Sequence, residues 1–225
     1  MNAPIKMWLF GQPFTGKTHF AASWPKPFIL STDGNARFYK DQVEYAKISS
    51  LQDFNSEINR LIQGDHDYET IILDVTEHLY DLVRDYYLAK NNVDDESEMG
   101  GFAIGWRVIR NGFWSIIKKL ANTDYNVIFI SHEDVTITKD ALGRENFYFH
   151  PQVGNDKLRS QLSGIMQLIG RSTTTEVKIG DDIIKRYSIS FGSKSNEMSG
   201  IRLPMKKLEI ENTYDDLKNN IIQKQ

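Results

Sequence analysis

The octapeptide Gly11-Gln12-Pro13-Phe14-Thr15-Gly16-Lys17-Thr18 is the most informative stretch of this 225-residue chain. It matches the pattern G-x-x-x-x-G-K-[ST] of a phosphate-binding P-loop at every fixed position. The glycines allow backbone N–H groups to surround the phosphates of a nucleotide, and Lys17 can reach the β- and γ-oxygens. The Thr18 hydroxyl can bind Mg²⁺, a hard cation that prefers oxygen ligands. We therefore expect this octapeptide, together with His19, to bind ATP and Mg²⁺.

The surroundings of the motif support this interpretation. An apolar run over 5–10 precedes it and a helical pattern over 18–23 follows, which is the strand–loop–helix setting that a P-loop requires. Because Gly makes up about 7% of average proteins, a chance match somewhere in a chain of this length has a probability of about 1%.

Beyond the motif, strands and helices alternate. Apolar runs predict strands at 28–31, 70–75 and 127–131, and amphipathic patterns predict helices at 51–62, 77–90 and 104–121. This alternation indicates an α/β fold: a P-loop core with a mostly parallel central sheet flanked by helices and joined by right-handed crossovers.

The pattern changes after residue 133. It predicts a hairpin of strands 135–138 and 146–150, a helix at 155–169, and a second hairpin of strands 174–179 and 183–191 with its turn at Gly180-Asp181-Asp182. A last helix is expected near 214–223, with Thr213 as its N-cap. No repeat or linker divides the chain, so we expect one domain over 1–225, with its core at 5–133 and a β extension at 134–225.

Composition excludes several functions. The chain contains no Cys, which rules out disulfides, thiolate metal sites and cysteine nucleophiles. No His-Glu-x-x-His pattern occurs, and the apolar runs are too short to cross a bilayer. The N-terminus shows no secretion-signal layout, so a cytoplasmic protein with no membrane partner is expected.

Net charge is −3 but uneven. Residues 1–100 carry a balance of −7, whereas residues 157–207 carry +6. A basic face is therefore possible on an acidic protein, although ordinary scatter of surface charge would give the same counts.

Four polar residues follow predicted strands, at the sheet edge where open α/β folds bind ligands. Asp74 ends the strand over 70–74 and is expected to hold Mg²⁺ together with Thr18. Asp33 or Glu77 could orient the attacking water, and His132 could sense the γ-phosphate. Asp33, Glu77 and His132 each have a structural alternative: in that order, a turn-capping Asp, an acid in the first turn of a helix, and a His that fills a strand end.

At these residues the sequence resembles the RecA-like P-loop ATPases, and among them the phage-encoded nucleotide-binding proteins that include the Sak-type single-strand annealing proteins. The resemblance rests on the P-loop and on three further segments: Ile29-Leu30-Ser31-Thr32-Asp33-Gly34, Ile72-Leu73-Asp74 and Ile128-Phe129-Ile130-Ser131-His132. It is close over 5–133 and extends to the remainder only in layout. It implies an oligomeric ring or filament with slow, DNA-stimulated ATP hydrolysis, which binds single-stranded DNA and promotes annealing or strand exchange, in the host cytoplasm if phage-encoded.

The resemblance also implies two DNA-binding loops, which correspond by layout to 91–105 and 133–156. The first carries four carboxylates and no basic residue, so it would repel phosphates. The second brings cations beside aromatic rings, a combination that suits single strands, although the aromatic residues could instead belong to the core. We expect DNA contacts from Lys139, Arg144, Phe147, Tyr148 and Lys157. By the same resemblance, Lys194 or Arg202 would reach the γ-phosphate of a neighbouring subunit.

A second function fits the same residues. A nucleotide-gated loader or adaptor for a replication or defence protein would bind ATP with little turnover. Besides DNA and further copies of this chain, the expected partner is a single-strand binding protein or another replication or recombination protein. A small-molecule kinase is a third possibility, but such enzymes usually close an Arg-rich lid over the phosphates, and the hairpin over 135–150 offers only Arg144.

Overall fold

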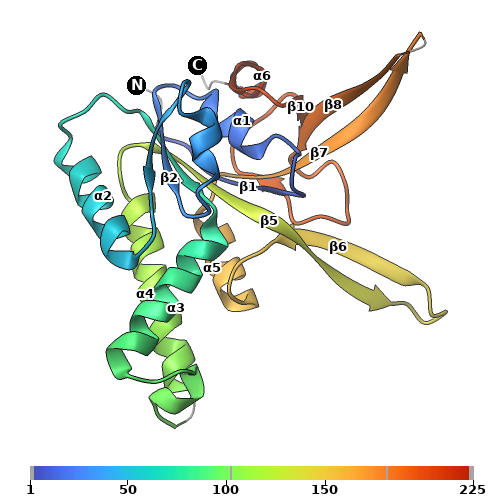
Figure 1. Cartoon of the computed structure of the whole chain (residues 1–225). Helices are drawn as coiled ribbons and strands as arrows, with labels where there is room; N and C mark the ends of the chain where they lie inside the picture. Colours follow the sequence, from blue (N-terminus) through green and yellow to red (C-terminus); the bar gives the residue numbers. More distant parts are fainter. Residues whose placement is uncertain (1–2, 102, 181, 223–225) are drawn as a thin grey trace.

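The computed structural model describes residues 3–101, 103–180 and 182–222, and these residues form one sheet with helices on both faces (Figure 1). Within this part of the chain the main path of the sheet runs β10-β8-β7-β1-β5-β4-β2-β3, with β6 beside β5 and β9 beside β7. The strands are β1 (Lys6–Gly11), β2 (Pro27–Ser31), β3 (Glu44–Lys47), β4 (Thr70–Asp74), β5 (Asn126–Lys139), β6 (Glu145–Pro151), β7 (Leu168–Ile179), β8 (Asp182–Ser190), β9 (Gly200–Ile201) and β10 (Glu209–Glu211).

The centre of the sheet is parallel. Strands β7, β1, β5, β4, β2 and β3 pair in parallel along this order, and every residue of β1 and β4 is buried. Burial on both faces is the reason that these strands are almost continuously apolar in sequence. Their carboxyl ends meet at one edge, which is where the P-loop and Asp74 lie.

The helices divide between two apolar layers. One layer packs α2 (Leu51–Gln63), α3 (Thr76–Asn91), α4 (Ile104–Ala121) and α5 (Asp156–Ile165) against the sheet. The other layer lies under α1 (Lys17–Ala22) and α6 (Tyr214–Asn220). The α/β architecture with a mostly parallel, helix-flanked sheet and a terminal helix is thus confirmed. Two short 3₁₀ helices, η1 (Asn35–Tyr39) and η2 (Glu96–Met99), complete the described elements.

Most predicted elements lie within a residue or two of the observed ones. The helix at 104–121 is confirmed at both ends, and the predicted cap Thr213 accepts a hydrogen bond from the backbone N of Asp216. The last helix ends at Asn220, before the predicted residue 223, which lies outside the described residues. Asp181 of the predicted turn also lies outside them.

The helix predicted over 155–169 is wrong at its C-terminal end. Helix α5 stops at Ile165, and Leu168 begins β7, which pairs in parallel with β1. A short apolar run is compatible with both the helical and the strand periodicity. Here the hydrogen-bonded pairing with the buried strand β1 decides for a strand. The sheet therefore continues past residue 133 through β7, β8 and β10. Strand β3 and the short strands β9 and β10 were not predicted because they are too short to show a period.

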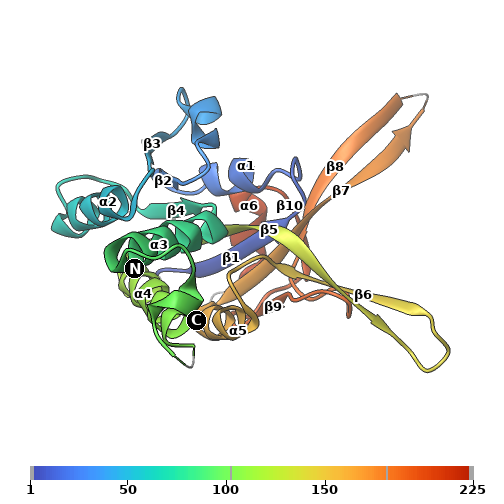
Figure 2. The same ribbon diagram turned by 60° about the horizontal axis from the view of Figure 1, so that its bottom comes forward.

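Two hairpins project beyond the sheet and diverge from each other (Figures 1 and 2). The strands predicted at 127–131 and 135–138 form the single long strand β5, which continues into a hairpin with β6; β7 and β8 form the other hairpin. Between them β1 ends at Gly11, which pairs with His132 on one side and Ser172 on the other. The P-loop therefore begins between the bases of the two hairpins.

Candidate nucleotide site

The two P-loop glycines occupy positions that a side chain would not fit. A Cβ atom added to Gly11 would lie 2.3 Å from the carbonyl oxygen of Ser172, because β7 passes directly beside the end of β1. Gly16 has φ +85, the left-handed region that favours glycine, and a Cβ there would meet Asn212 at 2.4 Å. The backbone of the loop can therefore approach both the sheet and a phosphate closely.

Lys17 lies buried inside the loop. Its Nζ donates to the carbonyl oxygens of Gly11 at 2.8 Å and Gln12 at 2.9 Å. Burial lowers the pKa of the Lys17 ammonium, and four nearby carboxylates, of which Asp74 has the largest effect, oppose this shift. The loop thus holds a cation at its centre without a direct ion pair within the described residues, as a phosphate-binding lysine requires.

Thr18, in the first turn of α1, meets Asp74 at the end of β4 although β1, which leads into the P-loop, is not adjacent to β4. Strand β5 lies between β1 and β4, yet Thr18 Oγ1 donates to Asp74 Oδ2 at 2.7 Å. Burial raises the pKa of Asp74 to about 6, and the hydrogen bond from Thr18 opposes that shift.

A hydroxyl and a carboxylate are oxygen donors that suit Mg²⁺. In the described part of the chain, no group of three or more His or acidic residues lies close enough together to hold a metal.

Glu77 and His132 form a pair behind this site. Glu77 Oε1 accepts hydrogen bonds from the backbone N of His132 at 3.0 Å and from its Nδ1 at 2.5 Å. Glu77 is buried, and its Oε2 has no hydrogen-bond partner within the described residues. This pair lines a cavity of about 490 Å³ that continues between the start of α3 and α5. A buried carboxylate oxygen without a partner is available to accept a proton or a water hydrogen bond.

Asp33 is engaged in its own turn. Its carboxylate accepts hydrogen bonds from the backbone N of Asn35 at 2.9 Å and from Asn35 Nδ2 at 2.6 Å, and Ser31 Oγ lies 3.3 Å away. It lies close enough to Asp74 and Lys17 to influence their pKa values. Asp33 is therefore near the phosphate site, but it has the turn-stabilising contacts of the structural alternative.

The remaining predicted nucleotide contacts lie at the mouth of the loop. Three of them are exposed: Pro13, Phe14 and His19. Phe14 is 95% exposed and has a positive φ of 66°. Thr15 is buried, and its hydroxyl donates back to the carbonyl of Gln12 at 2.8 Å. The loop therefore presents one face to the protein and one to solvent.

The C-terminal part of the chain supports the P-loop from behind. Ser172 Oγ of β7 donates to the carbonyl of Thr15 at 2.7 Å, and Asn212 Nδ2 donates to the carbonyl of Gly16 at 3.1 Å. Sequence reasoning missed both residues. They lie more than 150 positions from the loop, and single Ser and Asn residues carry no signal that would have identified them.

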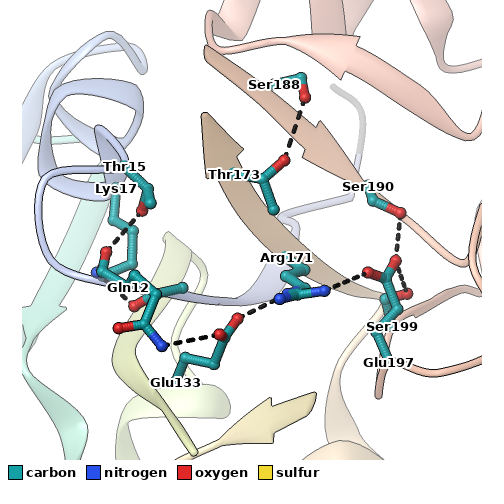
Figure 3. A network of polar contacts seen from close by, with 11 residues as sticks. Gln12, Thr15, Lys17, Glu133, Arg171, Thr173, Ser188, Ser190, Glu197 and Ser199 are labelled. Atoms are coloured by element: carbon teal, nitrogen blue, oxygen red, sulfur yellow. Dashed lines mark hydrogen bonds and ion pairs between the residues drawn. The ribbon is translucent and has the colours of Figure 1, made fainter. Parts of the chain in front are cut away.

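A polar network extends from the P-loop across the sheet edge (Figure 3). Gln12 Nε2 donates to Glu133 Oε1 at 2.9 Å, and Arg171 Nε donates to Glu133 Oε2 at 2.6 Å. Arg171 Nη1 also donates to Glu197 Oε2 at 3.4 Å. Arg171 was not among the predicted site residues. The only sequence signal for it was a charged residue at the end of an apolar run.

The residues predicted to contact DNA are not brought together with the P-loop. Phe147 and Tyr148 lie on the β5–β6 hairpin, 43% and 42% exposed, so the core alternative for Phe147 is wrong. Arg144 is paired with Asp140 at 2.8 Å, and Lys139 Nζ is 4.0 Å from Glu145. Exposed cations also lie at other predicted positions: Lys157 on α5, Lys194 in the loop after β8, and Arg202 after β9.

A parallel sheet that carries a P-loop, with the Asp74 carboxylate hydrogen-bonded to Thr18 of that loop, defines a P-loop nucleotide-binding protein. The family of AAA domains designated AAA_24 matches residues 3–203, and the chain belongs to this family. This membership confirms the P-loop ATPase class that the sequence predicted.

Among solved structures, a KaiC-like protein from the hyperthermophilic archaeon Pyrococcus horikoshii is similar, with 12% identity and a TM-score of 0.43. The match covers 83% of this chain and 78% of the archaeal one. No curated protein matches the sequence. Across the described residues, no helix combines the length and apolarity needed to span a membrane.

Proposed function

We propose that this protein is a Mg²⁺-dependent ATPase that acts on single-stranded DNA as a homo-oligomer, as its resemblance to the phage Sak-type annealing proteins implies. The observation that carries the proposal is the arrangement at one edge of the sheet of Lys17, the Thr18–Asp74 pair and Glu77 Oε2, which has no hydrogen-bond partner among the described residues. These are the parts that phosphoryl transfer to water requires: a phosphate cation, metal ligands and a group that orients water.

Each residue has a role that its contacts support. Lys17 exchanges the carbonyls of Gly11 and Gln12 for the β- and γ-phosphate oxygens. Thr18 and Asp74 would hold Mg²⁺, which would neutralise phosphate charge when bound. Glu77 accepts a hydrogen bond from the attacking water, and His132, bound to the other Glu77 oxygen, responds to the γ-phosphate.

The DNA partner is assigned to the β5–β6 hairpin. Phe147 and Tyr148 are successive residues of β6, where they pair with Ile137 and Thr136, and they therefore belong to opposite faces of this hairpin. Exposed aromatic rings can stack on unpaired bases, and Lys157 supplies a cation for the backbone. Lys194 or Arg202 would complete the site of a neighbouring subunit in the oligomer.

Steady-state ATP hydrolysis with Mg²⁺, with and without an oligo(dT) strand, tests the proposal. We expect hydrolysis that rises with oligo(dT) and disappears in Lys17→Ala, which removes the phosphate cation but little of the core. Lys118→Ala, an exposed substitution on α4, serves as the matched control and should behave as wild type. Wild-type hydrolysis that survives in Lys17→Ala would refute the site.

A nucleotide-gated adaptor is a second candidate, and the hairpin charges favour it. Arg144 and Lys139 each face a carboxylate of the same hairpin, Asp140 and Glu145, so a phosphate would have to compete with an existing ion pair at both positions. Tight ATP binding with a near-zero rate, unchanged by oligo(dT), would support this function over the first. The partner would then be a protein.

The salt dependence of oligo(dT) binding tests whether Arg144 contacts DNA, as the DNA-dependent ATPase requires and the adaptor does not. Each phosphate contact contributes about 0.7 to the slope of log K against log salt for single strands. Arg144→Ala should flatten the slope by about this amount if the hairpin touches phosphate. An unchanged slope would remove Arg144 from any DNA site.

A further inference from the structure

Arg171 is a buried cation held between two buried carboxylates. The side chain of Arg171 is 12% exposed, and those of Glu133 and Glu197 are 3% and 0% exposed. Its Nε lies 2.6 Å from Glu133 and its Nη1 lies 3.4 Å from Glu197. Burying three charges carries a large desolvation cost, which this geometry offsets only while all three remain together.

Three segments that the sequence singled out meet at this arginine. Glu133 links it to Gln12 of the P-loop through a hydrogen bond of 2.9 Å. Its guanidinium carbon lies 3.7 Å from the ring centroid of Phe149, at the base of the β5–β6 hairpin. Glu197 links it to the loop after β8, which carries Lys194.

The hairpin and this loop are also joined directly. The backbone N of Phe149 donates to the carbonyl of Asn196 at 2.9 Å, and the backbone N of Met198 donates to the carbonyl of Phe149 at 2.7 Å. Glu197 Oε1 in turn accepts a hydrogen bond from Ser199 Oγ at 2.9 Å (Figure 3). A displacement at the base of the hairpin therefore changes the position of both Arg171 contacts.

We propose that Arg171 and Glu133 are positioning residues for ATP hydrolysis: they hold Gln12 of the P-loop in place and make that hold depend on the base of the β5–β6 hairpin. The proposal rests on the proposed ATPase function and adds to it the route by which the hairpin acts on the phosphate site. A ligand that shifts Phe149 shifts Arg171, and Glu133 then changes its hold on Gln12.

The charges give this route its effect on nucleotide. The Glu133 carboxylate lies near enough to Lys17 to raise its pKa, so its charge also acts on bound phosphates. The guanidinium of Arg171 offsets that negative charge. When Arg171 moves away, the phosphate site becomes more negative and triphosphate binds less tightly.

A double-mutant cycle between Glu133→Gln and Phe149→Leu tests the proposal without any partner molecule. ATP Kd is measured by equilibrium binding, and kcat and KM by steady-state hydrolysis. If Arg171 connects the two positions, the change in ATP Kd of the double variant should differ by about threefold or more from the product of the two single-variant changes. Multiplicative effects would overturn the proposal.

Tyr148→Leu provides the matched control, because Tyr148 is next to Phe149 but belongs to the other face of the hairpin. Its effect on ATP Kd should multiply with that of Glu133→Gln within about twofold, since the two side chains share no partner. If the Tyr148 cycle deviates from the product of its single effects as much as the Phe149 cycle does, both substitutions act by loosening the hairpin as a whole. That result would also overturn the proposal.

Arg171→Lys separates positioning from simple stability. Lysine keeps the charge but lacks the planar fork that contacts both carboxylates. We expect a higher ATP Kd and a smaller stimulation by oligo(dT) when both are measured well below the melting temperature of the variant, which should itself fall because one buried carboxylate loses its partner. Wild-type values of both would overturn the proposal. Wild-type protein that binds no ATP would instead refute the proposed function itself, so the two failures are distinguishable.

Discussion

Glu77 and His132 are joined twice: one carboxylate oxygen of Glu77 accepts both the backbone N–H and the ring N–H of His132. This double contact leaves Glu77 Oε2 buried and without a partner in the described part of the chain, while it ties the start of α3 to the end of the parallel portion of β5. The nearby Asp33 has both of its oxygens engaged by its own turn. The two candidate water-orienting residues therefore differ in availability.

Replacing Glu77 should affect turnover far more than replacing Asp33. Glu77→Gln keeps the shape and the His132 contact but removes the proton acceptor, so kcat should fall by about 10²–10⁴-fold with little change in ATP Kd. Asp33→Asn should lower kcat by less than about tenfold. Steady-state kinetics of both variants measures the difference. A larger loss of kcat in Asp33→Asn would assign the role to Asp33.

The pair should also make stability depend on pH. The hydrogen bond to Glu77 raises the pKa of His132 above its ordinary value of 6.5, and partial burial opposes the shift. A group whose pKa is raised by folding contributes its full stabilisation at pH values below its pKa in the unfolded chain. That stabilisation is lost as pH rises through its pKa in the folded protein. The wild-type advantage over His132→Gln in urea denaturation should therefore be largest below pH 6.5 and shrink as pH rises above that value. A difference in the free energy of unfolding between wild type and His132→Gln that stays constant with pH would contradict a stabilising Glu77–His132 hydrogen bond.

Asp74→Asn should increase stability while it removes activity. Burial raises the pKa of Asp74 to about 6, from 3.8. The folded state therefore loses stability as pH rises from about 4 to about 6, and the loss is complete above that range. An uncharged Asn avoids this cost, so the variant should gain roughly 2 kcal/mol in the free energy of unfolding at pH 7. The gain should fade towards pH 4. Urea denaturation at several pH values and Mg²⁺-dependent hydrolysis check both effects.

Two glycines should respond oppositely to alanine. At Gly11 the new Cβ would collide with the backbone of Ser172, so Gly11→Ala should lower the free energy of unfolding by about 1–3 kcal/mol. Gly164 lies in α5 with open space around it, so Gly164→Ala should raise it by about 0.5–1 kcal/mol. Chemical denaturation compares the two. Equal effects would mean that β7 does not pack against the P-loop as described.

The phosphate site and the centre of the sheet follow from the amino-acid sequence alone. The fixed residues of the P-loop lie within the single stretch 11–18, and parallel strands that are buried on both faces are apolar throughout, so a polar residue marks the end of such a strand. Lys17, Thr18 and Asp74 can therefore be identified from the order of the residues. The same local logic correctly places α4 and the cap of α6.

The surroundings of that site follow only from how the chain packs in three dimensions. Packing distinguishes the unpartnered Glu77 from Asp33, and it brings Ser172, Asn212 and Arg171 to the P-loop from distant segments. It also turns the end of the predicted helix over 155–169 into β7 beside β1. Contacts between residues far apart in the chain depend on how strands pair and layers pack, and a short polar or apolar stretch carries no record of the partner that it will meet.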